Sequence, residues 1–196
     1  MLKIALTGSI GMGKSTALEI FKFFGIAGVD SDKIVHAIYE NPDLNDFKDL
    51  FSDVIIDGQI DRKSLAEKLV QKPELLVELE KIIHPQVSKK LNEFNDKYST
   101  NTYTIFDIPL LFEKKKETDY QIRIVITAPF SVQKDRVLAR THMTAEKFNF
   151  IISHQMDDIS KKKKAHFIIL SYKDIQNLRA QIKSFLRSLA YIQAER

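Results

Sequence analysis

Eight residues near the N-terminus, Gly8-Ser-Ile-Gly-Met-Gly-Lys-Ser15, follow the pattern G-x-x-x-x-G-K-[ST]. In this pattern a glycine-rich turn points its backbone N–H groups at a chain of phosphates, and side chains at the turning positions would block that approach. The lysine reaches the β- and γ-phosphates, and the hydroxyl after it ligates Mg²⁺. The spacing therefore predicts a nucleoside triphosphate and magnesium as ligands.

Glycine is scarce in the rest of the chain. Of its six glycines, three lie within Gly8–Gly13, which indicates that this hexapeptide needs unusual backbone conformations. A glycine turn without a ligand is the competing interpretation, and the position of the loop between a predicted strand and a predicted helix disfavours it. The dinucleotide pattern G-x-G-x-x-G fails, because its third glycine position counted from Gly11 holds Thr16. We expect the loop to contact the nucleotide through Gly8, Gly11, Met12, Gly13, Lys14, Ser15 and Thr16.

Acidic residues follow two of the predicted strands. Asp30 and Asp32 come directly after the second strand, at the edge of the sheet where α/β proteins bind their ligands. One carboxylate can organise Mg²⁺ or its waters, and the other can accept a proton from an attacking hydroxyl. A helix N-cap is an equally good interpretation of this spacing. Asp107 ends the third strand and is either a water-mediated magnesium ligand or an ordinary polar residue at a strand end.

The loop and the acids require a framework of strands and helices. Short apolar runs predict five strands, and stretches with helical spacing separate them, so we expect an α/β fold with a doubly wound, five-stranded parallel sheet. The predicted strands are 3–7, 26–29, 103–107, 121–127 and 167–170, and the predicted helices of the sheet are 15–24, 131–140, 144–154 and the C-terminal segment.

The region between residues 33 and 98 is mostly helical in pattern and too long for a simple crossover, so we predict a helical insertion that binds the second substrate. Within it, Pro42 is expected at the first position of a helix. Asp57-Gly58 predicts a turn, and Pro85 predicts a kink or break near His84. Outside it, Gly25 is expected to cap the first helix and Thr144 to cap a later one.

Composition limits the class of protein. The chain has 196 residues, 44% hydrophobic and 29% charged, which is typical of a globular domain. It has no cysteine, which excludes disulfides, thiol nucleophiles and cysteine zinc sites. It has no apolar run of about 18 residues and no signal-peptide pattern at the N-terminus. We therefore expect a cytoplasmic protein with no membrane partner.

The net charge is +4 and the sequence pI about 9.1, which fits either a nucleic-acid partner or a site for several phosphates. The lysine runs 114–116 and 161–164 lack interleaved aromatic residues, so we expect solvated surface and no nucleic-acid partner. His36, His142, His154 and His166 show no metal-ligand spacing and are expected at the surface.

Several motifs in one order resemble the dephospho-coenzyme A kinases. The resemblance covers roughly residues 1–170. Its motifs are the loop from Leu6 to Thr16, Val29-Asp-Ser-Asp32, Asp57-Gly-Gln-Ile-Asp-Arg-Lys-Ser-Leu65, Ile83-His-Pro85 and Ile108-Pro-Leu-Leu-Phe-Glu113.

The resemblance implies that ATP phosphorylates the 3′-hydroxyl of the ribose of dephospho-CoA, giving CoA and ADP as the last step of coenzyme A biosynthesis. Asp32 would be the general base, with Lys14 and Arg140 as the other catalytic residues. Arg136 and Arg140 would approach the ATP phosphates. Arg62, His84 and Leu111 would bind the acceptor together with Asp32, and Mg²⁺ would be held by Ser15 and, through water, by Asp30 and Asp107.

The resemblance also implies a division of the chain. The P-loop kinase-like core would comprise residues 1–33, 99–136 and 163–196, the acceptor domain 34–98 and a short lid 137–162. We expect a monomer or a weak homo-oligomer.

The sequence departs from the family at two places. Ile151 stands where a lid arginine is expected, and Leu170-Ser171-Tyr172 replaces an Asp-Asn-x-Gly turn near the adenine. We therefore expect a looser nucleotide preference, and we hypothesise that the lysines 161–164 supply the missing lid charge.

Two other functions remain open from the residues. One is another P-loop kinase that phosphorylates a nucleoside, a nucleotide or a different metabolite. The other is a nucleotide switch or nucleic-acid binder without kinase activity, although the guanine-reading sequence Asn-Lys-x-Asp is missing.

Overall fold

The computed structural model describes residues 1–141 and 143–194. Contacts divide the chain into two compact units. The sheet unit consists of Met1–Asp30 and Tyr98–Arg196, and the helical unit of Ser31–Lys97. The boundaries thus fall at 30/31 and 97/98, against 33/34 and 98/99 in the prediction.

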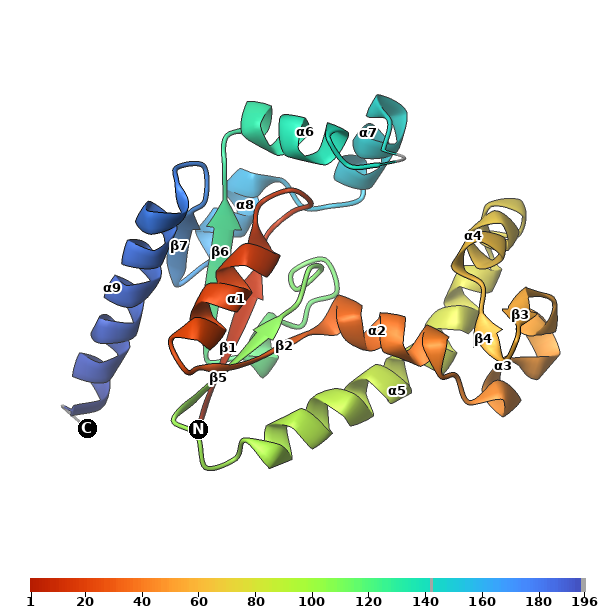
Figure 1. Cartoon of the computed structure of the whole chain (residues 1–196), viewed down its shortest axis with the longest axis horizontal. Helices are drawn as coiled ribbons and strands as arrows, with labels where there is room; N and C mark the ends of the chain where they lie inside the picture. Colours follow the sequence, from red (N-terminus) through yellow and green to blue (C-terminus); the bar gives the residue numbers. More distant parts are fainter. Residues whose placement is uncertain (142, 195–196) are drawn as a thin grey trace. The chain divides into compact units, whose positions relative to one another are not determined.

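The sheet unit contains a parallel sheet with the strand order β2-β5-β1-β6-β7, which confirms the predicted doubly wound architecture (Figure 1). The predicted strands are found, with bounds that differ by at most a residue at either end. They are β1 (Leu2–Thr7), β2 (Ala27–Asp30), β5 (Tyr103–Asp107), β6 (Ile122–Thr127) and β7 (Phe167–Leu170). The phosphate loop follows the central strand β1, so it lies at the carboxyl edge of the sheet, where α/β folds bind ligands.

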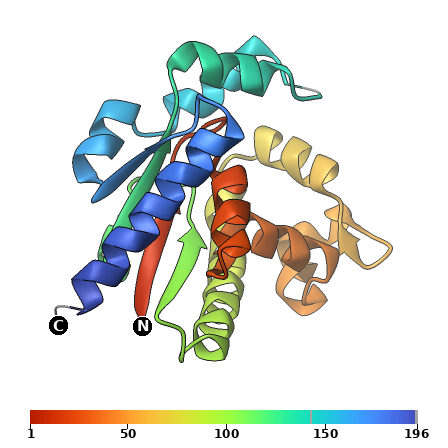
Figure 2. The same cartoon turned by 60° about the vertical axis from the view of Figure 1, so that its left-hand side comes forward.

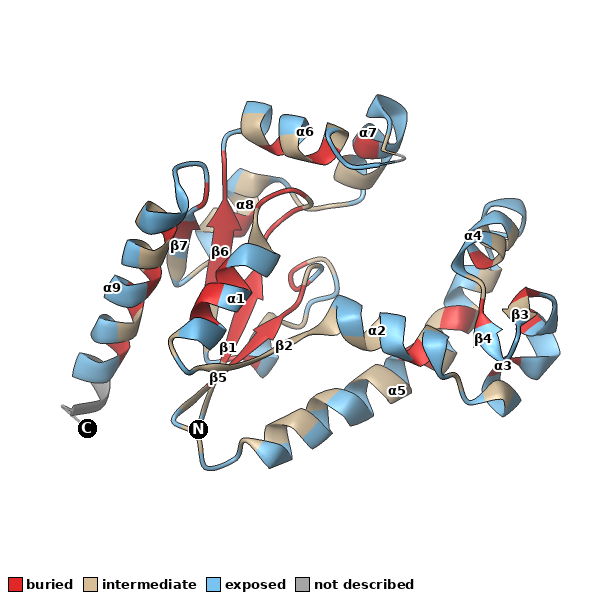
Figure 3. Ribbon diagram, viewed as in Figure 1, coloured by how far each residue is buried: buried red, intermediate tan, exposed pale blue. Residues whose placement is uncertain are grey.

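Two helices cover one face of the sheet. They are α1 (Lys14–Phe23) and α9 (Ile175–Ala194), which lie side by side in Figure 2. The rings of Phe21 and Phe185 meet edge to face with centroids 6.0 Å apart. Along α9 the buried positions form one stripe and the opposite side is exposed, whereas the central strands β1, β5 and β6 are buried over their last four residues (Figure 3). This is the pattern of an amphipathic helix on a parallel sheet whose central strands are covered on both faces.

Three further helices follow β6 in the sheet unit. They are α6 (Phe130–Leu138), α7 (Ala145–Ser153) and α8 (Asp158–Lys164), and a short 3₁₀ turn, η2 (Glu117–Asp119), precedes β6. The predicted caps are present, since Gly25 adopts φ 82° after α1 and the Thr144 side chain accepts from Lys147 N at the start of α7. Helix α8 was not predicted, because its run of lysines suggests only surface charge.

The helical unit has a hydrophobic core of its own. Its elements are α2 (Ser31–Glu40), α3 (Leu44–Phe51), η1 (Ser52–Val54), β3 (Ile55–Ile56), β4 (Gln59–Ile60), α4 (Arg62–Gln71) and α5 (Leu75–Lys97). The buried core residues are Ile38, Phe47, Phe51, Val54, Ile60, Leu65, Leu79 and Ile83. A separate core is what allows an insertion of this length to form a compact unit.

Three predictions for this unit need correction or extension. Pro42 does not begin a helix, because Asp43 caps α3 through Asn45 N and the helix starts at Leu44. Helix α5 continues through Pro85 without a break, since burial of Leu79 and Ile83 favours the whole helix over the one lost hydrogen bond. The Asp57-Gly58 turn is present with positive φ at both residues, and it joins an unpredicted hairpin of β3 and β4.

No helix within residues 1–141 and 143–194 is both long and apolar enough to cross a membrane.

Candidate active site

The glycines of the phosphate loop are required by both conformation and space. Gly11 and Gly13 have φ of 77° and 85°, values that other residues rarely adopt. A Cβ on Gly11 would lie 2.5 Å from Cγ2 of Val137 in α6, and one on Gly13 would lie 3.2 Å from the Ser171 side chain. The loop is therefore packed tightly against α6 and the end of β7.

The Gly11→Ala variant is expected to bind ATP about tenfold more weakly or worse, because the positive φ costs roughly 1–2 kcal/mol and α6 must also move. Gly25→Ala is a matched control, since Gly25 has a similar φ of 82° with nothing within 4 Å of the added Cβ. It should lose some stability and keep its affinity for ATP. Calorimetric titration with ATP measures the affinity of the two variants. Equal losses of affinity in Gly11→Ala and Gly25→Ala would contradict this account of the loop.

Lys14 and Ser15 form the beginning of α1. The Lys14 ammonium donates to the carbonyl of Gly8 at 2.8 Å, across the turn. The side chains of Ser15 and Thr16 are exposed in the first turn, where backbone N–H groups have no partner within the helix and the helix dipole favours an anion. A polyphosphate bound here would meet the amides, the ammonium and the Ser15 hydroxyl together.

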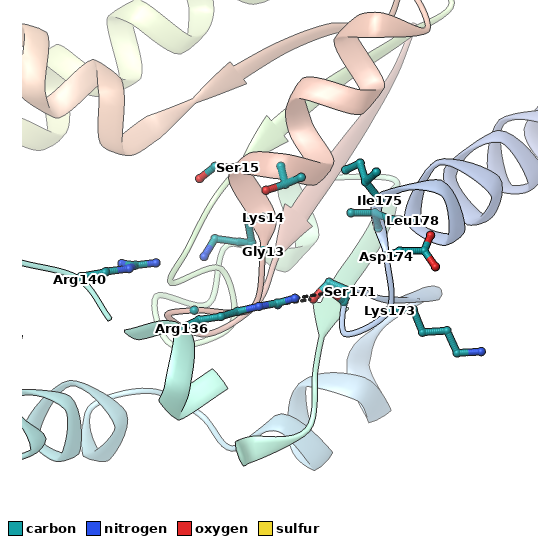
Figure 4. A pocket seen from close by; sticks show the side chains of 12 residues that line it. Gly13, Lys14, Ser15, Arg136, Arg140, Ser171, Lys173, Asp174, Ile175 and Leu178 are labelled. Carbon is teal, nitrogen blue, oxygen red and sulfur yellow. Dashed lines mark hydrogen bonds between the residues drawn. The ribbon is translucent and has the colours of Figure 1, made fainter. Parts of the chain in front are cut away.

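A pocket of about 350 Å³ opens at this helix end. It brings together most of the nucleotide-binding residues predicted from sequence, including Arg136 of α6 and Arg140, which follows that helix closely (Figure 4). Gly8 and Met12, which were also expected to contact the nucleotide, do not line this pocket. The pocket is lined by Gly11, Gly13, Lys14, Ser15, Thr16, Arg136, Arg140, Ser171, Lys173, Asp174, Ile175 and Leu178.

Arg136 is held by Ser171, which belongs to a segment where the sequence departs from the family. Its guanidinium donates from Nη1 to Ser171 Oγ at 3.1 Å and from Nη2 to the Ser171 carbonyl at 2.6 Å (Figure 4). The Ser171 hydroxyl in turn donates to the Met12 carbonyl at 2.7 Å. Ser171 therefore joins Arg136 to the phosphate loop.

Two glutamines also hold the loop, and no sequence pattern pointed to them. Gln155 accepts from the backbone N–H of Ile10 at 3.0 Å, and Gln133 donates to the Ile10 carbonyl at 2.8 Å. Both backbone groups of Ile10 are thus paired. Only the tertiary structure identifies them, because Gln133 lies in α6 and Gln155 lies after α7, both far from the loop in the sequence.

Two of the acidic candidates are neighbours on adjacent strands. Asp30 and Asp107 are direct partners in the register of β2 and β5, and Asp107 is buried with 2% of its surface exposed. Carboxylate and hydroxyl oxygens are the donors that Mg²⁺ prefers, usually with waters and substrate phosphates completing its shell. Asp30, Asp107 and Ser15 therefore fit the chemistry of this ion, although no group of three or more acidic or histidine side chains forms a cage among the described residues.

Asp32 lies in the first turn of α2, which begins directly after β2. It is the second residue after Asp30 and its side chain is exposed. Asp32 therefore lies where the chain passes from the sheet edge into the helical unit. Its role as the general base stays a prediction.

The helical unit contains a pocket of about 360 Å³. Arg62, which is exposed at the start of α4, lines it together with Tyr39. Burial raises the pKa of Tyr39, and the charge of Arg62 acts in the opposite direction. His84 is exposed on α5 and is not part of this pocket. Leu111 is completely buried in the sheet unit, so acceptor contacts by His84 and Leu111 stay predictions.

The lysines at 161–164 lie outside the pocket at the start of α1. Lys161, expected at the surface, is fully buried and pairs with Glu113. Lys162 pairs with Asp158, and Lys164 pairs with Glu117. None of these lysines lines the pocket at the start of α1, so the hypothesis of replacement lid charge gains no support here and stays a prediction.

The histidines show no sign of a metal site in the described part of the chain. His36, His154 and His166 are exposed, as expected. Burial and the neighbouring Arg123 lower the pKa of His166. His142 lies outside the described residues.

Comparisons with known proteins cover almost the whole chain. The model of the dephospho-CoA kinase family matches residues 2–177. A dephospho-CoA kinase from Bartonella quintana is 41% identical over 189 residues, which is 95% of this chain and 97% of that protein. A solved structure from Thermus thermophilus has a TM-score of 0.82 at 30% identity, with 96% and 97% of the two chains covered. The dephospho-CoA kinase from Campylobacter jejuni has a TM-score of 0.73 at 28% identity, with 97% and 98% covered.

Proposed function

Because this chain belongs to the dephospho-CoA kinase family, we propose that its residues transfer the γ-phosphoryl group of ATP to the ribose 3′-hydroxyl of dephospho-CoA, giving CoA and ADP. The observation that supports this most strongly is the pocket at the start of α1, where Lys14, Arg136 and Arg140 surround a phosphate loop. Phosphoryl transfer needs mainly positioning and neutralisation of charge, and this pocket supplies both.

ATP binds with its phosphates in the loop. The backbone N–H groups between Gly8 and Ser15 and the Lys14 ammonium hold the β- and γ-phosphates. Arg136, fixed by Ser171, adds a positive charge whose position does not have to be reorganised during the reaction. Arg140 at the same pocket would approach the transferring group.

The Ser15 hydroxyl would hold Mg²⁺ directly, and Asp30 and Asp107 would hold it through water. The bound ion would neutralise negative charge that develops on the phosphates.

Asp32 would accept the proton of the 3′-hydroxyl as that oxygen attacks the γ-phosphorus and the bond to the β-phosphate oxygen breaks. Arg62, His84 and Leu111 would bind dephospho-CoA, and the pocket that Arg62 lines supports its part in this. We assign residues 1–33, 99–136 and 163–196 to nucleotide binding, 34–98 to the acceptor and 137–162 to a lid. Closure of the lid would exclude water, which otherwise competes with the hydroxyl for the phosphoryl group.

Transfer from ATP to dephospho-CoA tests this function. Product formation is measured as ADP release and by mass spectrometry of CoA. It is expected to depend on the acceptor, to stop when a chelator removes Mg²⁺, and to return when Mg²⁺ is added. ADP release that is independent of dephospho-CoA would indicate a nucleotide switch. ADP release that occurs only with another alcohol acceptor would indicate a kinase for a different metabolite.

The base of the nucleotide is expected to lie beside residues 173–178 of the pocket. Asp174 caps α9. Hydrogen bonds from backbone N–H groups, of which that of Asn177 has the largest effect, lower the pKa of its carboxyl group. The family's Asp-Asn-x-Gly turn is missing here, so we expect GTP to be used with a kcat/KM within about tenfold of that for ATP, a difference of roughly 1.4 kcal/mol. Parallel kinetics with the two nucleotides check this, and strict selectivity for ATP would contradict it.

A cytoplasmic location, a monomer or weak homo-oligomer, and the lack of nucleic-acid and membrane partners stay predictions for this enzyme.

A further inference from the structure

A buried ion pair joins two segments of the sheet unit that are far apart in the sequence. Lys161 of α8 is completely buried, and its ammonium lies 2.9 Å from Oε1 of Glu113 in the loop after β5. Only 14% of the Glu113 side chain is exposed. Burying two charges is costly unless they are paired closely, so the two segments are held in one arrangement.

The same carboxylate oxygen has a second partner. Oε1 of Glu113 accepts from the backbone N–H of Met156 at 2.8 Å. Met156 lies between α7 and α8, directly after Gln155, the residue that holds Ile10 of the phosphate loop at 3.0 Å. A continuous set of contacts therefore leads from Lys161 through Glu113 and the backbone at 155–156 to the loop.

The other oxygen of the carboxylate adds to this argument. Among residues 1–141 and 143–194, Oε2 of Glu113 and Nζ of Lys161 are both buried without a hydrogen-bond partner, so the contact between the two side chains is an ion pair alone. Lys161 and Met156 are thus the groups seen to position the carboxylate. A second pair, Lys164 with Glu117 at 2.8 Å, joins the same two segments and is partly exposed, with 45% and 22% of the side chains exposed, so solvent screens it more than the buried pair.

We propose that Glu113 and Lys161 are positioning residues for ATP binding: the buried pair fixes Met156, and through Gln155 it keeps the phosphate loop in the shape that receives a triphosphate. This inference rests on the proposed function, because it takes ATP as the nucleotide. It predicts that loss of the Met156 contact weakens ATP binding and raises the KM for ATP, while the KM for dephospho-CoA stays unchanged.

Two double variants separate positioning from simple stabilisation. Removing one partner alone would leave a buried charge unpaired and destabilise the fold, so both charges are removed together. Glu113→Gln with Lys161→Met keeps an oxygen that accepts from Met156 N. Glu113→Leu with Lys161→Met has no such acceptor. The second is expected to bind ATP about three- to tenfold more weakly than the first, the effect of one hydrogen bond.

The dissociation constant for ATP is measured by calorimetry without acceptor, after thermal unfolding has shown that each variant is folded. Glu117→Gln with Lys164→Met is the matched, partly exposed control and should leave the affinity unchanged. Glu113→Asp, which keeps the charge but shortens the side chain, gives a second test and should weaken binding about threefold.

Wild-type affinity in both the Leu/Met variant and Glu113→Asp would overturn the proposal. Equal losses in the two double variants, or equal rises in the KM for ATP and for dephospho-CoA, would overturn it as well. Failure of the proposed function is a separate result, since it would appear as a lack of transfer to dephospho-CoA by the wild type.

Discussion

Asp32→Asn is expected to lower kcat by about 10²- to 10⁴-fold, the usual contribution of a general base. The amide has nearly the shape of the carboxylate but cannot accept the proton of the ribose hydroxyl. The KM for ATP and for dephospho-CoA should change little, because the substitution removes an interaction that matters in the transition state. Steady-state kinetics with each substrate varied in turn measure this.

Asp49→Asn is the matched control for that variant. Asp49 is also an exposed aspartate of the helical unit, on α3, and it lines none of the pockets described for the site. Its substitution should leave kcat unchanged. Near-normal turnover by Asp32→Asn would rule out Asp32 as the base, and a similar loss in both variants would point to a general effect of the charge.

Lys14→Met is expected to reduce kcat/KM for ATP by on the order of 10²- to 10³-fold, as for the loss of other preorganised donors to a developing anion. The methionine keeps most of the length of the side chain and removes the ammonium that donates to Gly8 in this structure. Stability should fall only slightly, because the Lys14 side chain is half-buried and leaves room for the thioether.

Lys22→Met provides the comparison within the same helix. Lys22 lies in the last turn of α1 and pairs with Glu19 on the surface. It should retain the activity of the wild type, since an exposed pair of this kind contributes at most about 1 kcal/mol to stability. If Lys14→Met transferred phosphate at close to the normal rate, the pocket at the start of α1 would not be the site of the γ-phosphate.

Both predictions depend on features that lie within short stretches of sequence. The phosphate loop was predictable because its determinants, the glycines, Lys14 and Ser15, fall within eight consecutive residues. The strands were predictable from local apolar runs, and the caps at Gly25 and Thr144 from single residues whose conformational or hydrogen-bonding properties act locally.

The contacts that fix the site could not be predicted in this way. Ser171 lies 35 positions from Arg136, and Gln155 lies 145 positions from Ile10. Any serine or glutamine can make such hydrogen bonds, so the residue type alone carries no information about the partner. Only the arrangement of β7, α6 and the segment after α7 around the loop selects these side chains.

The burial of Lys161 could likewise not be predicted from the sequence. In the sequence it is the first of four lysines, and such a run indicates a solvated surface. The turns of α8 point these side chains in different directions, and the one at Lys161 meets the carboxylate of Glu113 inside the protein. The sequence by itself thus determined the phosphate loop and the parallel sheet, because local conformation and apolar patterning encode them. The tertiary structure alone decided which distant polar groups are paired, because that pairing depends on how the helices pack.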